Sequence, residues 1–218
     1  MIYNFHAVCN TPGILTQCLI RYNKILAKEQ FGFRSKSSTD LASFNLINEI
    51  LEVLNDRLLV VGIFCNLQKA FDCVDHEILL AKMCQYGIIG KGLKLITSYL
   101  QNRKQRVIIS SKSKPYYSEW ESIKQGVPRG SVLGPLLFLI YINDLPQSIK
   151  PLANPVLFAD DTSMIVKLNE PCEFIHTLQR NIIKADRWFK SNSLLLNMDK
   201  THLLQFSTKT GQIMDLEV

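Results

Sequence analysis

Short, strongly apolar runs alternate along this chain with longer segments in which apolar residues recur at helical spacing. The run 58–67 is apolar at most positions, which predicts a strand. Helical spacing predicts helices at 14–27, 38–55, 75–86, 93–100, 133–144 and 171–191. Further short strands are predicted at 106–110, 116–122, 194–197 and 203–206. This mixed order favours an α+β domain with helices packed on one face of an antiparallel sheet.

Polar and turn-forming residues set the ends of several predicted helices. One residue of 38–40 is expected to cap the helix at 38–55, and Asp75 the helix after it. Gly87 would end that second helix, and Pro146 would stop the helix at 133–144. The helix at 38–55 is expected to present an apolar face of Leu41, Phe44, Ile47, Leu51 and Leu54. The last predicted helix carries a core stripe of Phe174, Leu178, Ile182, Ala185 and Phe189.

Two adjacent carboxylates, Asp160 and Asp161, lie between apolar runs that are too short for helices and rich in Val, Ile and Phe. This pattern predicts a hairpin with both carboxylates at its tip. Two carboxylates on a rigid turn form a hard, anionic oxygen site of the kind that Mg²⁺ or Mn²⁺ prefers. The alternative is an acidic surface turn, since Asp favours turns.

Composition and charge narrow the class of protein. The chain has 218 residues, is 47% hydrophobic and carries a net charge of +6, which fits a globular protein and permits a nucleic-acid partner. Six cysteines without C-x-x-C spacing, no signal peptide and no long apolar run predict an intracellular protein, nuclear or cytoplasmic, that is neither secreted nor membrane-bound. One group of basic residues either lies on a solvated surface or contacts phosphate. The group consists of Arg103, Lys104, Arg106, Lys112 and Lys114.

Five blocks in order resemble the reverse transcriptase of non-LTR (LINE-like) retrotransposons, particularly the jockey-like group. They are residues 30–34, 64–72, 125–135, 158–161 and 197–201. The resemblance implies a polymerase palm with part of the fingers over 29–207. Residues 1–28 would be a weakly patterned segment, 208–218 a tail, and the thumb is expected to be absent.

The resemblance implies an RNA-directed DNA polymerase that transfers a nucleotide from a dNTP to the 3′-hydroxyl of a DNA primer on an RNA template. Two Mg²⁺ (or Mn²⁺) ions would serve this chemistry. Asp160 and Asp161 match two of the family's three metal ligands, whereas Asn66 stands where the family has Asp. Because hard cations bind largely through ligand charge, we predict that this substitution impairs catalysis.

Two further residues match family positions near the incoming nucleotide. Phe71 matches the bulky residue beneath the sugar, where a ring would clash with a 2′-hydroxyl; it could instead be a core Phe. Arg34 resembles the fingers Arg near the triphosphate, although a surface Arg is the alternative.

The loop after the predicted hairpin and the last block supply the remaining candidates. Gln125 and Gly126 match the loop that positions nucleotide and template, and Arg129 departs from the usual Gln there. Lys200 matches a Lys that could give a proton to the leaving pyrophosphate, or it simply faces solvent.

Two other functions remain open. The chain could be an inactive retrotransposon relic that at most binds nucleic acid, which Asn66 favours. It could also be another palm-type enzyme such as a nucleotide cyclase, against which the Gln125–Gly126 loop and the block at 197–201 argue.

Overall fold

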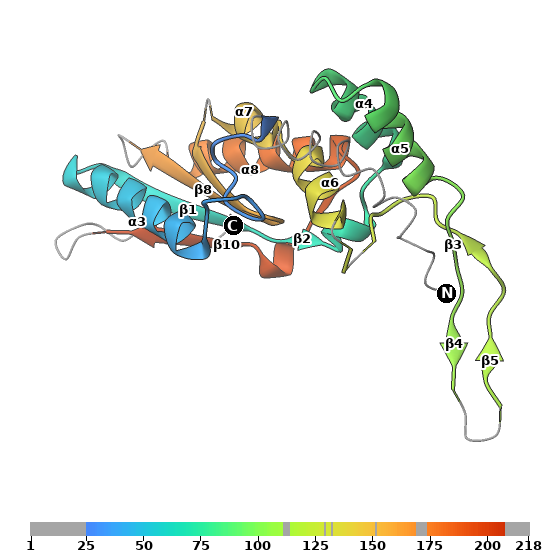
Figure 1. The fold of residues 1–218 in the computed structure, drawn as a ribbon. Helices are drawn as coiled ribbons and strands as arrows, with labels where there is room; N and C mark the ends of the chain where they lie inside the picture. The colour runs from blue at the N-terminus through green and yellow to red at the C-terminus, as the bar shows by residue number, and fades with distance from the viewer. Residues whose placement is uncertain are drawn as a thin grey trace.

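A four-stranded antiparallel sheet forms the centre of the molecule (Figure 1). The computed structural model describes residues 25–110, 114–128, 130–131, 133–150, 152–168 and 174–207, so the expected helix at 14–27 and the tail at 208–218 fall almost wholly outside the described residues. The strand order is β10-β1-β8-β7. The strands are β1 (Leu59–Cys65), β7 (Asn154–Phe158), β8 (Asp161–Leu168) and β10 (His202–Phe206).

Strand β1 is apolar at most positions because it lies between two strands and is covered on both faces. Val61 pairs with Val166 on one face, and both side chains are fully buried. On the other face, Val60 and Ile165 belong to a second, smaller cluster. Side chains alternate between the faces of a strand, so a strand that is buried on both faces needs an unbroken apolar run.

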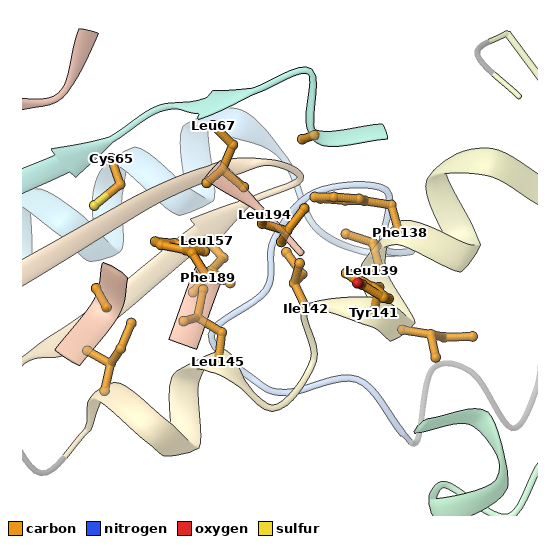
Figure 2. Close-up of a cluster of buried hydrophobic side chains, with 14 of the residues drawn as sticks. Cys65, Leu67, Phe138, Leu139, Tyr141, Ile142, Leu145, Leu157, Phe189 and Leu194 are labelled. Carbon is orange, nitrogen blue, oxygen red and sulfur yellow. The ribbon is translucent and has the colours of Figure 1, made fainter. Parts of the chain in front are cut away.

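The large core lies on the first face of the sheet, and the predicted α+β class is confirmed. It is covered by α4 (His76–Gln85), α5 (Gly90–Leu100), α6 (Leu133–Tyr141), α7 (Leu145–Ile149) and α8 (Phe174–Ser191). Figure 2 shows its centre, with Cys65, Leu67, Phe138, Leu139, Tyr141, Ile142, Leu145, Leu157, Phe189 and Leu194. The core stripe predicted for α8 is confirmed at Leu178, Ala185 and Phe189; the side chain of Phe174 lies outside the described part of the chain.

The predicted capping residues are confirmed, but the expected role of Pro146 is wrong. Asp75 accepts hydrogen bonds through Oδ1 from two N–H groups of the first turn of α4, and Gly87 follows that helix at φ +78°. Helix α6 already ends at Tyr141, and Pro146 lies in the first turn of α7. Pro lacks an N–H that the first turn would leave unpaired in any case, so it starts a helix as readily as it stops one.

Helix α3 (Thr39–Asn55) has the predicted Ser38 cap but packs through a different face from the one expected. Ile50 and Val53 pack on Val60 of β1 and Ile165 of β8. Four members of the expected face are exposed: Leu41, Phe44, Ile47 and Leu51. Two apolar stripes run along this helix, and the periodicity alone does not decide which one meets the sheet.

A hairpin arm extends away from the body beyond α5 (Figure 1). Its base is the pair β3 (Lys104–Gln105) and β6 (Glu121–Ser122), and its outer part is the pair β4 (Ile108–Ile109) and β5 (Tyr116–Tyr117). The predicted hairpin is confirmed, with shorter strands than expected.

Short elements complete the described fold. They are β2 (Leu67–Gln68), which pairs with β9 (Leu195–Leu196), and the 3₁₀ turns η1 (Ala70–Asp72) and η3 (Met198–Lys200). None of the helices in the described part of the chain has the length and apolar character needed to span a membrane.

Candidate active site

The two carboxylates occupy the tip of the β7–β8 hairpin, as predicted. Phe158 pairs with Asp161, which leaves Ala159 and Asp160 as the turn between the strands. Asp160 is half-buried and Asp161 is exposed. Ala159 has φ +56°, a left-handed conformation that residues other than glycine adopt rarely and that persists only where the surroundings hold it.

The side chain of Gln30 holds this turn. Its Oε1 accepts hydrogen bonds from the N–H of Ala159 at 3.0 Å and of Gly32 at 2.8 Å, and its Nε2 donates to the carbonyl of Ala159 at 3.4 Å. Gln30 is only 3% exposed, so these bonds satisfy a buried amide. The sequence placed Gln30 in a family block but gave it no role; a Gln close to the predicted Ser/Lys-rich turn carries no local signal of such a contact.

The segment around Gln30 lies directly against the carboxylate hairpin. The N–H of Phe31 donates to the carbonyl of Leu157 at 2.8 Å, and the N–H of Leu157 donates to the carbonyl of Glu29 at 2.9 Å. A Cβ atom on Gly32 would lie 2.3 Å from the nitrogen of Ala159. Only glycine therefore permits this approach of backbone to backbone.

Asn66 lies at the end of β1, next to the carboxylates. The last β1–β8 pair is Cys65 with Thr162, so the same register places Asn66 opposite Asp161. Asn66, Asp161 and Lys200 line one hollow of about 280 Å³. The position that departs from the family pattern therefore adjoins Asp161, and Asp160 is not among the residues that line this hollow.

The backbone of Asn66 also anchors the last block of the family pattern. The N–H of Asn197 donates to the carbonyl of Asn66 at 2.8 Å, and Thr201 Oγ1 accepts from the N–H of Asn66 at 3.4 Å. Thr201 Oγ1 in turn donates to the carbonyl of Asn197 at 2.8 Å. These contacts bring η3, and with it Lys200, to the end of β1.

The charges at the turn affect one carboxyl in particular. Although Asp161 is exposed, partial desolvation of its carboxyl raises its pKa above the usual value of 3.8, and the negative charge of Asp160 raises it further. Burial also raises the pKa of the Cys65 thiol to about 12, so this neighbour of Asn66 stays a neutral packing residue.

The donor atoms at this turn suit a hard cation, but they are few. Within the described ranges, no group of three or more His, Cys, Asp or Glu side chains could hold a metal ion. The remaining donors are the carboxylates of Asp160 and Asp161 and the amide oxygen of Asn66. This set matches the oxygen ligands of Mg²⁺ in kind, with one negative charge fewer than three carboxylates would provide.

The loop after the arm packs on the turn that follows β2. Gly126 donates through its N–H to the carbonyl of Val74 at 2.7 Å, and Val127 donates to the carbonyl of Phe71 at 2.8 Å. Gly126 has φ +88°, and a Cβ there would lie 2.8 Å from the carbonyl oxygen of Asp72. The sequence missed His76, whose Nε2 lies 2.9 Å from the carbonyl oxygen of Gly126.

The ring of Phe71 packs at the edge of the large core. Its ring stacks on that of Phe138, with centroids 4.7 Å apart and planes 27° from parallel. It is only half-buried and lies beside the Gly126 loop rather than in the middle of the core.

Arg34 and Gln125 are not among the residues that line the carboxylate hollow. Arg34 donates through Nη1 to the carbonyl of Ala27 at 3.0 Å. Gln125 is exposed and lines a second hollow together with Gly126. Arg129 lies outside the described residues.

The sequence matches a known family over most of its length. A family model described as reverse transcriptase (RNA-dependent DNA polymerase) matches residues 11–212. A probable RNA-directed DNA polymerase from transposon BS of Drosophila melanogaster is 32% identical over 199 residues, 86% of this chain and 21% of that protein. The RNA-directed DNA polymerase from the mobile element jockey of the same species is 30% identical over 196 residues, again 86% and 21%. The chain thus spans about a fifth of the length of these curated relatives.

Solved structures with the same fold come from telomerase. Apo telomerase from Candida tropicalis, truncated from its C-terminal domain, matches with a TM-score of 0.67 at 16% identity, over 94% of this chain and 42% of that one. Telomerase from the same species in complex with a fragment of telomeric RNA gives 0.68 at 13% identity, over 94% and 35%. At these identities the likeness concerns the fold alone.

Proposed function

Because the chain belongs to the reverse transcriptase family, we propose that it is the palm and part of the fingers of an RNA-directed DNA polymerase, and that Asn66 impairs its activity. One observation carries the proposal: Asp161, Asn66 and Lys200 line a single hollow at the end of β1, beside Asp160. These residues come from three separate stretches of the chain. The fold brings them together at one hollow.

In the proposed reaction, the primer 3′-oxygen attacks the α-phosphorus of a dNTP. A new P–O bond forms as the bond to pyrophosphate breaks, and the hydroxyl proton passes from the attacking oxygen to water. Asp160 and Asp161 would hold Mg²⁺, which when bound neutralises phosphate charge and favours the attacking alkoxide. Lys200 lines the same hollow and could give a proton to the leaving pyrophosphate.

The fixed geometry of the turn supports this role. Gln30 and Gly32 hold the turn through buried contacts, so the carboxylates are positioned before any substrate arrives. Such preorganisation accounts for much of the catalysis of phosphoryl transfer, in which the protein mainly positions groups and stabilises charge.

Asn66 is the reason to expect a lower activity than a chain with Asp at this position would have. Its amide keeps one oxygen donor at the position opposite Asp161 but provides no negative charge. Weaker cation binding lowers occupancy and leaves more phosphate charge uncompensated. The same observation favours the second candidate function, in which the chain binds nucleic acid without turnover.

Phe71 is proposed to select the sugar. It lies on η1, and its carbonyl accepts a hydrogen bond from the N–H of Val127, next to Gly126. A ring there would exclude a 2′-hydroxyl. In an active version, Phe71→Ala is expected to admit ribonucleotides; unchanged sugar selectivity would contradict this role.

The test is Mg²⁺-dependent primer extension on an RNA template, with the chain as given and Asn66→Asp side by side. We expect extension from Asn66→Asp at a rate at least about 100-fold above the chain as given, because removing one electrostatic contact to a transition state costs about that factor. Asp161→Asn in the Asn66→Asp background is the control and should abolish extension.

The other outcomes separate the alternatives. Equal extension by both chains would contradict the prediction that the negative charge missing at residue 66 lowers activity. Extension by neither, with RNA binding intact, would leave the non-catalytic relic as the function. A cyclic product from a lone triphosphate would indicate a nucleotide cyclase.

A further inference from the structure

A large hollow lies at the base of the hairpin arm, outside the carboxylate hollow. It has a volume of about 710 Å³, and its lining includes Arg103, Gln105 and Lys124 from the arm and Gln125 and Gly126 from the loop that follows. Asp72, which also lines it, has an interaction of its own. Two cations thus line a hollow large enough for several atoms of a phosphodiester chain.

Arg103 has unused hydrogen-bonding capacity at this hollow. Its Nη1 is buried and has no hydrogen-bond partner among the described residues, and its guanidinium carbon lies 5.9 Å from the ring centroid of Tyr99. A buried polar atom is normally hydrogen-bonded, and leaving it unpaired costs free energy. A guanidinium donor that is unpaired beside an open hollow is suited to an oxyanion, above all phosphate.

Higher on the arm, a β-bulge places a second guanidinium between two aromatic rings. Residues 104–105 pair with 122–121, and residues 108–109 pair with 117–116, so two residues, 106 and 107, lie opposite three, 118–120. The N–H of Ser118 donates to the carbonyl of Val107 at 3.0 Å, which leaves Arg106 opposite both Glu119 and Trp120. Bulges redirect side chains in this way. The guanidinium carbon of Arg106 lies 4.4 Å from the ring centroid of Tyr117 and 4.6 Å from that of Trp120.

The arm exposes aromatic surface together with positive charge. Tyr116 is 65% exposed, Tyr117 54% and Trp120 44%, because a two-stranded arm covers neither of its faces. Its described ranges, 103–110 and 114–124, carry five Lys or Arg residues against two Glu. No ion pair within the described residues engages any of those five cations.

We propose that the described part of this arm, residues 103–110 and 114–124, is a docking surface for single-stranded RNA. Phosphates bind at its base through Arg103 and Lys124, and bases stack on the exposed rings of Tyr116, Tyr117 and Trp120. Exposed rings interleaved with cations are the combination that holds single strands, since every base has a stacking face and every nucleotide a phosphate. That the strand is RNA rather than DNA rests on the function proposed above; the chemistry of the arm suits either.

The arm also adjoins the loop that would meet the template. Gln125 follows Lys124 directly, and Gly126 lines the same hollow as Arg103. A strand that lies along the arm would therefore reach the palm at this loop. The surface extends the site past the carboxylates and would grip a template strand before it reaches them.

The test is fluorescence anisotropy with a labelled single-stranded RNA of about 16 nucleotides, the upper site size of single-strand binding folds. EDTA is present and dNTP is absent, so the result does not depend on catalysis. The cation variant is Arg103→Gln with Lys124→Gln, and the aromatic variant is Tyr117→Ser with Trp120→Ser. The control, Lys184→Gln with Arg187→Gln, removes one Lys and one Arg from α8. Circular dichroism confirms that each variant is folded.

Each variant has its own expected signature. The cation variant should weaken binding and reduce the slope of log affinity against log salt by roughly 0.7 for each phosphate that the protein no longer neutralises. The aromatic variant should weaken binding at least about fivefold per ring with an unchanged salt slope. The control should match the chain as given.

Three results would overturn the proposal. One is equal losses in the arm variants and the control, which would indicate binding by net charge alone. Another is tighter binding of duplex RNA or of single-stranded DNA than of single-stranded RNA. The third is unchanged RNA binding in both arm variants, which would leave a protein partner as the occupant of the arm. A failure of primer extension would not contradict RNA docking on the arm. An absence of RNA binding at the arm would not contradict the reaction proposed at the carboxylates.

Discussion

The carboxylate turn and the hairpin arm are both β-hairpins, yet the fold treats them in opposite ways. The turn is held from outside by the buried side chain of Gln30 and by close backbone contact at Gly32. In its described ranges, 103–110 and 114–124, the arm has exposed side chains at almost every position and is held by a few backbone pairs. Groups that react must be fixed within fractions of an ångström, whereas a surface that holds a strand needs accessible rings and charges.

The two hairpins therefore differ in what they contribute to stability. Buried groups in close packing contribute most of the free energy of folding, and exposed groups contribute little. Substitutions at the turn should lower stability and function together. Substitutions on the arm should lower binding alone.

The largest effect is expected for Gly32→Ala. The new Cβ would lie 2.3 Å from the backbone nitrogen of Ala159, which no rotamer change can relieve. We expect a loss of more than about 3 kcal/mol in the free energy of unfolding, measured by urea denaturation. Gly90→Ala is the matched control: Gly90 has positive φ but no heavy atom within 4 Å of its added Cβ, so only the backbone cost of about 1 kcal/mol remains. Similar losses in the two variants would show that the close contact at Gly32 is unimportant.

Gln30→Ala should have the next largest effect. The change leaves the buried N–H groups of Ala159 and Gly32 without their acceptor, at a cost of about 2–3 kcal/mol. Asn45→Ala is the control, since the Asn45 side chain also donates to a backbone carbonyl, that of Leu41, but in an exposed position. The control should lose less than about 0.5 kcal/mol. An equal loss in both variants, again by urea denaturation, would contradict the special role of Gln30.

Local signals in the sequence predicted much of this architecture. The Asp160–Asp161 hairpin, the Asp75 cap and the stripe of α8 depend on residues that are close in sequence, and all three are confirmed. Their patterns follow from the geometry of a single strand or helix. The family resemblance named Asn66 and the block at 197–201 but predicted no contact between them, and the hydrogen bond from Asn197 to Asn66 is a finding of the structure.

The features that the sequence missed depend on long-range contacts. Gln30 meets Ala159, which is 129 residues away, and His76 meets Gly126, which is 50 residues away. The face of α3 was predicted wrongly because two apolar stripes compete, and only the position of the sheet selects Ile50 and Val53. No pattern within one element contains this information.

A smaller effect is expected from Asp161 and depends on pH. Its pKa is higher in the fold than its usual value of 3.8, so the folded state binds the proton more tightly than the unfolded state. Stability is thus lost as pH rises from the usual value through the folded value. Asp161→Asn should stabilise the protein at pH 7 by less than about 1 kcal/mol, since the group is largely solvent-screened, and the gain should vanish below about pH 3.

Thermal unfolding of the chain and of Asp161→Asn, followed from about pH 3 to about pH 7, measures this gain. The range is chosen because it begins near the usual pKa of a carboxyl group. A stability difference that stays constant over the range would contradict the raised pKa.

The smallest effect on stability is expected on the arm. Tyr116→Thr keeps a residue that favours strands and removes a ring that is 65% exposed, opposite Ile109. We expect a loss of less than about 0.5 kcal/mol in the free energy of unfolding, because no buried contact is removed. Leu157→Ala in β7, at 1% exposure, is the comparison and should lose about 2–5 kcal/mol. If Tyr116→Thr cost as much as Leu157→Ala, the arm would be part of the folding core, and its exposed rings would no longer indicate a surface that binds a strand.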